Sequence, residues 1–338
     1  MPLPHPSRRD FLGAATLGLA GLAVGASRLG AQEAKPVEAK RPPNPYVYRF
    51  KVGELEAFSI SDGHMLFREG LGLMHPESDR PRMKAALESA RERTDALPLY
   101  INILGLRKGD EVALVDAGFG ARHPWVQFGW MEEGLAALGI RREQVTAGFL
   151  SHGHSDHLDG FVDGDKPTFP NAKVYALREE IDFWRAPEPD FSKTRRDRRP
   201  LPNMVSQARK CLDILERHGR LEAVRDGDRR WHDAVEILAA PGHTAGHACY
   251  EIRSGGESLV HLSDMVHHHQ LMFEDTGWTI ALDHDHEAAI ASRRRLFKRI
   301  AAARARAFAF HIPWPGLGTV VPKGEHYAWV PERWSWGS

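Results

Sequence analysis

The segment that most constrains this chain is a histidine-rich loop that follows an apolar run. The loop reads Ser151-His152-Gly153-His154-Ser155-Asp156-His157, and the preceding Val145–Leu150 has the pattern of a buried β-strand. Imidazole nitrogens and carboxylate oxygens at such short spacing are ligands that suit zinc and similar divalent ions. A solvated, histidine-rich turn is the alternative in a chain with 19 histidines. Four ligand-type side chains directly behind a strand favour a metal site.

Further ligand-type residues stand downstream, each where a strand pattern meets a turn. His243, Asp264 and His311 follow apolar runs at residues 235–238, 258–262 and 307–310. Loops at strand ends are where a rigid scaffold commonly displays its chemistry. Because four side chains cannot hold two ions, these additional ligands favour a two-metal site in which a carboxylate such as Asp264 bridges the ions.

This pattern resembles the metallo-β-lactamase-fold hydrolases, whose signature is His-x-His-x-Asp-His followed by single His, Asp and His ligands. The resemblance extends from Tyr46 to the C-terminus, and it is strongest to the branch of methyl parathion hydrolase and related lactonases. The segments that carry it are Ser61-Asp62-Gly63, Leu114–Gly118, Phe169–Ala172, Asp182–Trp184, Pro241–His243, Ser263-Asp264 and His311–Gly318. It implies an α/β fold, a four-layer αββα sandwich, over residues 46–338.

The resemblance also implies a ligand set of seven side chains. His152, His154 and His243 would hold one ion and Asp156, His157 and His311 the other, with Asp264 and a hydroxide bridging the two. Asp116 would hold the ligand loop in place, and His247 would support a ligand or face the pocket. Ser263 stands where the family usually has glycine, so we expect a local backbone adjustment. The ions are expected to be zinc, with manganese, cobalt or iron as alternatives.

The implied site favours hydrolysis of an ester-like bond. An ion held by three neutral imidazoles lowers the pKa of bound water, and a second ion polarises a carbonyl or phosphoryl oxygen. We expect the bridging hydroxide to attack a small-molecule lactone or aryl ester, with phosphotriesters as a side activity. Asp264 or Asp156 is the candidate to receive the proton and return it to the leaving oxygen. The sequence does not identify a separate general acid.

Aromatic and apolar residues near the strand ends are expected to form the substrate pocket. The expected pocket residues are Phe119, Trp125, Phe183 and Trp184, with Trp278 and Leu282 as the opposite wall. Each of these side chains is equally consistent with a core position. His267 would face the cleft with a titratable donor, where an apolar residue would suit parathion-like substrates. The triplet His267–His269 is equally consistent with a polar strand edge or with adventitious metal binding.

Two other functions stay open. One is β-lactam hydrolysis, which would usually need a cationic group for the substrate carboxylate and often a cysteine ligand. The other is a noncatalytic metal-binding or sensing protein on the same fold, which should have lost some of the ligands.

The N-terminus resembles a bacterial twin-arginine export signal. Ser7–Leu12 contains the arginine pair, and the small apolar run Gly13–Val24 is too short for a stable membrane span. We therefore expect a signal peptide over residues 1–31, a linker over 32–45, recognition by the twin-arginine export machinery and a periplasmic or secreted protein. A fortuitous arginine pair is the alternative.

Composition and periodicity supply the remaining expectations. Lys+Arg and Asp+Glu are both 45, so no basic field for nucleic acid is implied. The basic runs 193–199 and 293–295 are interpreted as a solvated loop and a solvated helix face, with attraction of anionic substrates as the alternative. Cys211 and Cys249 are expected to be core residues, and the branch resemblance implies a homodimer. Helical periodicity covers residues 83–93, 126–138, 203–218 and 286–306, and strand patterns fill 46–61 and 101–115.

Overall fold

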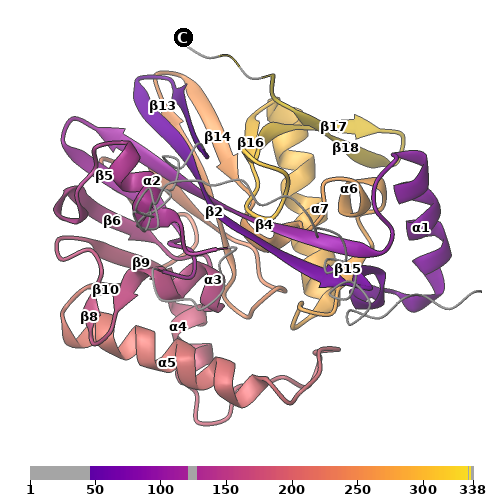
Figure 1. Ribbon diagram of the computed structural model, residues 1–338, viewed down its shortest axis with the longest axis horizontal. Coiled ribbons are helices and arrows are strands. Elements are labelled where there is room, and N and C mark those ends of the chain that lie inside the picture. Colours follow the sequence, from indigo (N-terminus) through magenta and orange to yellow (C-terminus); the bar gives the residue numbers. More distant parts are fainter. Residues whose placement is uncertain (1–45, 121–127, 334, 336–338) are drawn as a thin grey trace, which may run out of the picture. The chain divides into compact units, whose positions relative to one another are not determined.

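Two mixed β-sheets, each of seven strands, lie at the centre of the fold (Figure 1). The computed structural model describes residues 46–120, 128–333 and 335. The first sheet has the order β1 (Val47–Val52), β2 (Leu55–Arg68), β4 (Ala96–Lys108), β5 (Glu111–Val115), β6 (Val145–Phe149), β9 (Lys173–Leu177), β10 (Leu221–Val224). The second has the order β11 (Arg229–Arg230), β12 (Val235–Ala239), β13 (Ala248–Ser254), β14 (Glu257–His261), β16 (Arg306–Phe308), β17 (Leu317–Lys323), β18 (His326–Pro331).

Helices cover the outer faces of both sheets (Figure 1). Against the first sheet pack α2 (Met131–Ala137), α4 (Arg178–Arg185) and α5 (Leu201–Arg217), and against the second pack α1 (Arg80–Ser89), α6 (Leu271–Glu274) and α7 (His286–Ala303). The short helix α3 (Ser155–Leu158) begins inside the histidine-rich loop, and two small ribbons pair β3 (Met74–His75) with β15 (Thr279–Ile280) and β7 (Val162–Asp163) with β8 (Lys166–Pro167).

Three hydrophobic cores fill the three spaces between these layers. In β5, Val112 and Leu114 face the helices, whereas Ala113 and Val115 face the second sheet. Successive side chains of a strand point to opposite faces, so a strand covered on both sides must be apolar throughout. The third core lies between the second sheet and its helices. The expected four-layer αββα sandwich is therefore confirmed.

The parallel strand pairs bring the ends of distant segments together. β5 runs parallel to β6, and β14 runs parallel to β16. As a result Asp116 lies beside the loop after β6, and the segment after β14 lies beside the one after β16. Across the two sheets, the Ala248 N–H donates to the Ser151 carbonyl at 2.9 Å. The strand-end loops of both sheets thus meet at one edge of the sandwich.

The ends of the expected helices differ from those observed. The helix expected over 286–306 ends at Ala303, because Arg304 adopts a left-handed conformation (φ 51°) and Arg306–Phe308 pairs with β14. The helix expected over 126–138 is confined to Met131–Ala137, and residues 121–127 lie outside the described part of the chain.

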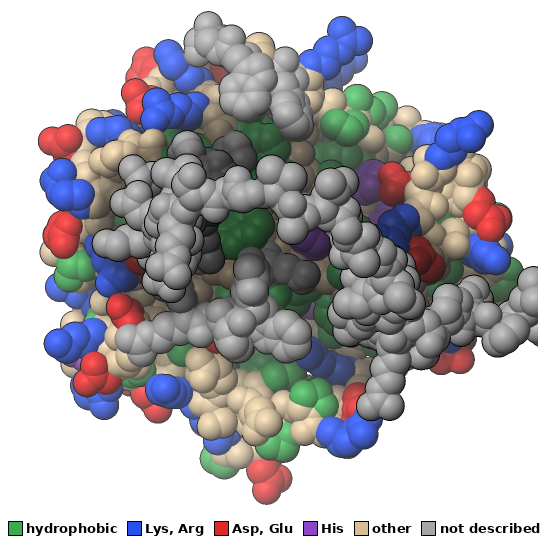
Figure 2. Space-filling view, viewed as in Figure 1, with side chains coloured by type: hydrophobic (Ala, Val, Ile, Leu, Met, Phe, Trp, Pro, Cys, Tyr) green, Lys and Arg blue, Asp and Glu red, His purple; other side chains and the backbone are tan. Residues whose placement is uncertain are grey.

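The expected export signal (1–31) and linker (32–45) lie outside the described residues, so export stays a prediction. Within the described part of the chain, no helix has the length and apolar character that crossing a membrane requires. Figure 2 shows acidic and basic side chains interspersed around the visible face, with hydrophobic and some histidine side chains nearer its middle. Cys211 and Cys249 are buried and free, which confirms them as core residues.

Asn102 ties β4 to the segment that ends in His311. Its buried Nδ2 donates to the carbonyls of Phe310 at 3.0 Å and Ile312 at 2.7 Å. In Asn102→Asp, carboxylate oxygens would face these carbonyls, so we expect the free energy of unfolding to fall by about 3 kcal/mol or more. Denaturant unfolding measures the change. The matched control is Asn171→Asp at an exposed site; equal changes in both variants would contradict the prediction.

Candidate metal centre

Seven buried ligand-type side chains converge where the strand-end loops meet. They come from the loop and short helix after β6, the loop after β12, the turn Ser263–Met265 after β14 and the segment after β16. They form two groups, and within each group the ligand atoms lie within 4.8 Å of one another. The first group is His152, His154, His243 and Asp264, and the second is Asp156, His157 and His311. These are the seven side chains named as ligands from the sequence.

The first group has a spacing close to that of ligands around one metal ion. His154 Nδ1 lies 2.9 Å from His152 Nε2 and 3.0 Å from His243 Nε2. Ligands placed tetrahedrally about 2.0–2.1 Å from zinc would lie about 3.4 Å from one another. Hydrogen bonds among three imidazole nitrogens that point at one position cannot give every nitrogen a partner. The donor set therefore fits a divalent ion.

Asp264 lies between the two groups. Its Oδ1 is 3.1 Å from His157 Nε2, whereas its Oδ2 is 3.1 Å from His311 Nε2 and 3.2 Å from His243 Nε2. In the second group, Asp156 Oδ2 lies 3.4 Å from His311 Nε2. Asp264 Oδ1 and His157 Nε2 face each other without a well-formed hydrogen bond, and neither atom has any other hydrogen-bond partner. Such orphaned atoms need a partner, and an ion held by both groups would supply it.

Outer acceptors fix the orientation of four of the five imidazoles. In each case the Nδ1–H donates outward, which leaves the Nε2 lone pair facing the centre. The four pairs are His157 with Asp116 Oδ2 (2.8 Å), His243 with Asp283 Oδ1 (2.8 Å), His311 with the Tyr100 carbonyl (2.6 Å) and His152 with Ser151 Oγ (3.0 Å). His154 is reversed and turns its Nδ1 inward.

Asp116 and His247 hold the backbone of the site. Asp116 accepts from the Ser151 N–H and from Ser151 Oγ, both at 2.8 Å. His247 Nε2 accepts from the Asp264 N–H at 3.1 Å. Ser263 has φ 45°, a conformation that glycine adopts most easily. This is the local adjustment expected where the family usually has glycine.

Glu180 joins the two principal ligand loops, and the sequence analysis did not identify it. It is buried, and each of its oxygens accepts two hydrogen bonds. Oε1 accepts from Gly153 N (2.8 Å) and Trp184 Nε1 (2.6 Å), and Oε2 from Thr244 Oγ1 (2.7 Å) and Gly246 N (2.9 Å). The available signal was an acidic residue one helical turn before Trp184, on the buried face of α4. Asp283, which orients His243, was missed as well.

Burial and charge set the protonation states at the site. Burial holds the pKa values of His152 and His154 well below the usual range. Burial opposes ionisation of Asp264, but the nearby His157 and His311 outweigh it and hold the pKa of Asp264 well below its ordinary value. Nearby carboxylates, Asp264 foremost, raise the pKa of His157 well above its ordinary value and that of His243 to about 9, against the effect of burial. Metal binds neutral imidazoles and ionised carboxylates, so an ion would displace the protons held by these two histidines.

A cavity of about 160 Å³ opens onto the two groups. Its lining residues are Met65, Phe67, Leu99, Phe119, His154, Ser155, Asp156, Arg196, Met204, Asp264, Leu282 and His311. Phe119 and Leu282 thus lie where the sequence placed them. Trp184 does not line the cavity, because it is fully buried with its indole N–H on Glu180. His267 also lies outside the lining, fully buried with its Nε2 3.2 Å from Asp264 Oδ2.

Other expected positions also need correction. Trp278 is buried away from the cavity lining, and its indole N–H donates to Asp79. Phe183 packs against His284, and Trp125 lies outside the described residues. Arg293 is not on a solvated helix face, because its fully buried guanidinium donates to the carbonyls of Met265, Thr276 and Trp278.

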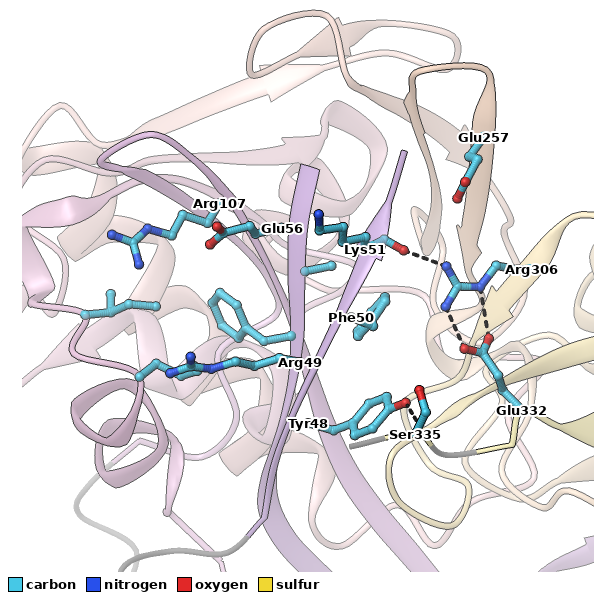
Figure 3. Close-up of a pocket in the computed structure, with 14 residues that line it drawn as sticks. Tyr48, Arg49, Phe50, Lys51, Glu56, Arg107, Glu257, Arg306, Glu332 and Ser335 are labelled. Atoms are coloured by element: carbon cyan, nitrogen blue, oxygen red, sulfur yellow. Dashed lines mark hydrogen bonds and ion pairs between the residues drawn. The ribbon is translucent and has the colours of Figure 1, made fainter. Parts of the chain in front are cut away.

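A larger cavity of about 530 Å³ lies beside β1 and contains none of the seven ligand-type residues (Figure 3). There the Arg306 guanidinium contacts both oxygens of Glu332 and the Lys51 carbonyl. Size alone would favour this cavity over the one at the ligands. The seven ligand-type side chains lie at the smaller cavity, so the chemistry of the chain points there.

Comparison with known proteins agrees with this geometry. Residues 96–311 match the family model described as the metallo-beta-lactamase superfamily. Among solved structures, AidC, a dizinc quorum-quenching lactonase in complex with a product, is 29% identical with a TM-score of 0.80, and the match covers 87% of this chain and 100% of AidC.

Two further solved structures share the fold. AbOPH, a hydrolase in the beta lactamase superfamily, is 25% identical with a TM-score of 0.77 over 86% of this chain and 98% of its own. A probable metal-dependent hydrolase from Staphylococcus aureus is 16% identical with a TM-score of 0.66, over 85% of this chain and 100% of its own. No curated protein matches the sequence.

Glu180→Gln should weaken metal binding. In the wild type each oxygen of Glu180 accepts two hydrogen bonds. In the variant the NH₂ group of the glutamine would face two of these donors and could not accept from them, which loosens the link between the two loops. We expect metal affinity to fall about 10–100-fold, the usual effect of losing an outer partner of a metal ligand. Metal retained after dialysis against graded chelator measures the affinity. The matched control is Glu179→Gln, an exposed neighbour on α4. Equal retention in the two variants would refute the role.

Proposed function

The chain belongs to the metallo-beta-lactamase superfamily, and on that basis we propose that it is a dinuclear metal-dependent hydrolase that opens lactone or aryl-ester bonds. The observation that carries the proposal is the position of Asp264 between two groups of inward-facing ligand atoms. A noncatalytic relative would be expected to have lost ligands, whereas all seven are assembled here.

Each protein group has a defined part in the proposed reaction. His152, His154 and His243 would hold one ion, and Asp156, His157 and His311 (the second group) the other, with the Asp264 carboxylate lying against both groups. Two bound divalent ions supply a nucleophile at neutral pH and polarise the substrate carbonyl. Asp156 and Asp264 both line the cavity, so either carboxylate is in place to accept a proton and return it to the leaving oxygen.

The cavity lining supports an apolar ester-like substrate. Phe119, Leu282 and neighbouring apolar side chains offer surface for a hydrophobic acyl or aryl group. The likeness to AidC, a dizinc lactonase, supports the same substrate class and supports zinc as the metal.

One observation favours β-lactam hydrolysis as a second candidate. Arg196 lines the cavity, so a cationic group is present where the carboxylate of such a substrate could be held. The proposed ligands nevertheless include no cysteine. Export through the twin-arginine machinery and assembly as a homodimer remain predictions from the sequence.

The purified protein should contain about two divalent ions per chain and lose its activity when they are removed. We expect turnover of an aryl lactone, an acyl-homoserine lactone or an aryl ester, abolished by chelation and restored by zinc. Elemental analysis and hydrolysis of a panel that includes a phosphotriester and a cephalosporin make the measurement. Cephalosporin turnover alone would favour the second candidate. Less than one ion and no turnover would favour a binding protein.

Asp264→Asn should reduce both metal content and rate. The amide offers one neutral oxygen in place of two oxygens that share a negative charge, so it binds two ions much less strongly. We expect a fall in kcat/KM of about 100-fold or more, together with loss of at least one ion. Metal analysis of the same preparation used for kinetics separates the two effects. Full activity with both ions retained would show that Asp264 does not bridge.

A further inference from the structure

Arg196 differs from the other cationic residues of its loop. The loop connects α4 to α5, and it was expected to be a solvated basic run. Lys193 there pairs with Asp285, and Arg199 pairs with Asp197. Arg196 instead lines the cavity over the metal ligands, beside His154 and Asp156. In the described part of the chain it is the only lysine or arginine in that lining.

The guanidinium of Arg196 has no partner among the described residues. Its backbone N–H donates to Thr194 Oγ1 at 3.3 Å, but no hydrogen bond or ion pair joins its side chain to another described residue. The residue is half-buried. Burial lowers the pKa of Arg196, and the Asp156 carboxylate only partly opposes this effect. A partly desolvated cation without a partner is costly, so its retention in a cavity wall calls for a ligand.

The surroundings of Arg196 indicate an anionic ligand. The imidazoles of His154 and His284 lie close enough for the charge of Arg196 to lower their pKa values. Asp156 is the nearby carboxylate, but its charge is engaged by an ion under the proposed function. Elsewhere the lining is largely apolar, with Phe119, Met204 and similar side chains. The cavity therefore offers the guanidinium of Arg196, a cation with several N–H donors, in a largely apolar wall.

We propose that Arg196 anchors a carboxylate carried by the substrate, so that the enzyme acts on esters or lactones with an apolar body and an anionic end. This inference rests on the proposed function and narrows its substrate class. A guanidinium presents N–H donors in a planar fork that matches both oxygens of a carboxylate. With its anionic end held at Arg196, the substrate can place its ester carbonyl at the ligand groups of the same cavity.

A pair of matched esters tests the anchor. 4-Nitrophenyl hexanoate and mono-4-nitrophenyl adipate have chains of equal length, and only the adipate ester ends in a carboxylate. In the wild-type holoenzyme we expect kcat/KM to be higher for the adipate ester. In Arg196→Gln the ratio of the two kcat/KM values should fall about 10–100-fold, the loss expected for a hydrogen-bonded ion pair. Most of the change should appear in KM.

Two further variants separate recognition from structure. Arg196→Lys keeps the charge but loses the planar fork, so it should restore part of the ratio. Arg199→Gln removes an exposed arginine from the same loop and should leave both rates unchanged. A wild-type ratio of one or below, or an unchanged ratio in Arg196→Gln, would overturn the proposal.

Binding of product-like ligands keeps the test independent of turnover. Calorimetry on the metal-loaded protein compares adipate, a dicarboxylate, with hexanoate, a monocarboxylate. The wild type should bind adipate at least about tenfold more tightly, and Arg196→Gln should bind the two equally. If the wild type hydrolyses neither ester, the proposed function fails, and the anchor is still decided by these affinities. Equal adipate preference in both proteins would overturn the anchor alone.

Discussion

The convergence of imidazole nitrogens on one position is the constraint around which this protein is built. Imidazole nitrogens held 2.9–3.0 Å apart around His154 Nδ1 cannot all be paired by shared protons, and each has been withdrawn from water. Without an ion, this arrangement lowers stability. The surrounding structure must therefore hold it from outside. Rigid strand ends supply the positions, and acceptors such as Asp116 and Asp283 supply the orientation of the rings.

The supporting contacts cross between the two sheets and from sheet to helix. Ser151 accepts from Ala248 across the sandwich, Asn102 holds the segment leading to His311, and Glu180 reaches from α4 into both principal loops. None of these groups is a proposed ligand. Because they connect elements far apart in the sequence, the shape of the centre depends on the whole sandwich.

The ligands could be predicted from the sequence, whereas the residues that support them through packing could not. The seven ligands were predictable because each follows a strand pattern and because their order along the chain matches the signature of a known family. Glu180 was not, because an isolated acidic residue on a helix is usually solvated, and only the approach of two glycines makes it a buried acceptor. Trp184 and Arg293 were misplaced for the same reason, since aromatic and cationic side chains can point into a cleft, a core or solvent. The end of α7 was missed because the turn at Arg304 has no glycine.

Part of the cavity wall over the centre comes from segments that hold none of the ligands. Met65 and Leu99 belong to long strands of the first sheet, and Arg196 belongs to the loop between α4 and α5. The ligands stand on other loops, with their own network of acceptors. Replacement of a wall residue therefore need not disturb the residues that retain the ions. Substitutions in the cavity wall can change which substrates the fold accepts while the metal-binding residues are kept. One ancestral fold can therefore give rise to enzymes with different substrate specificities.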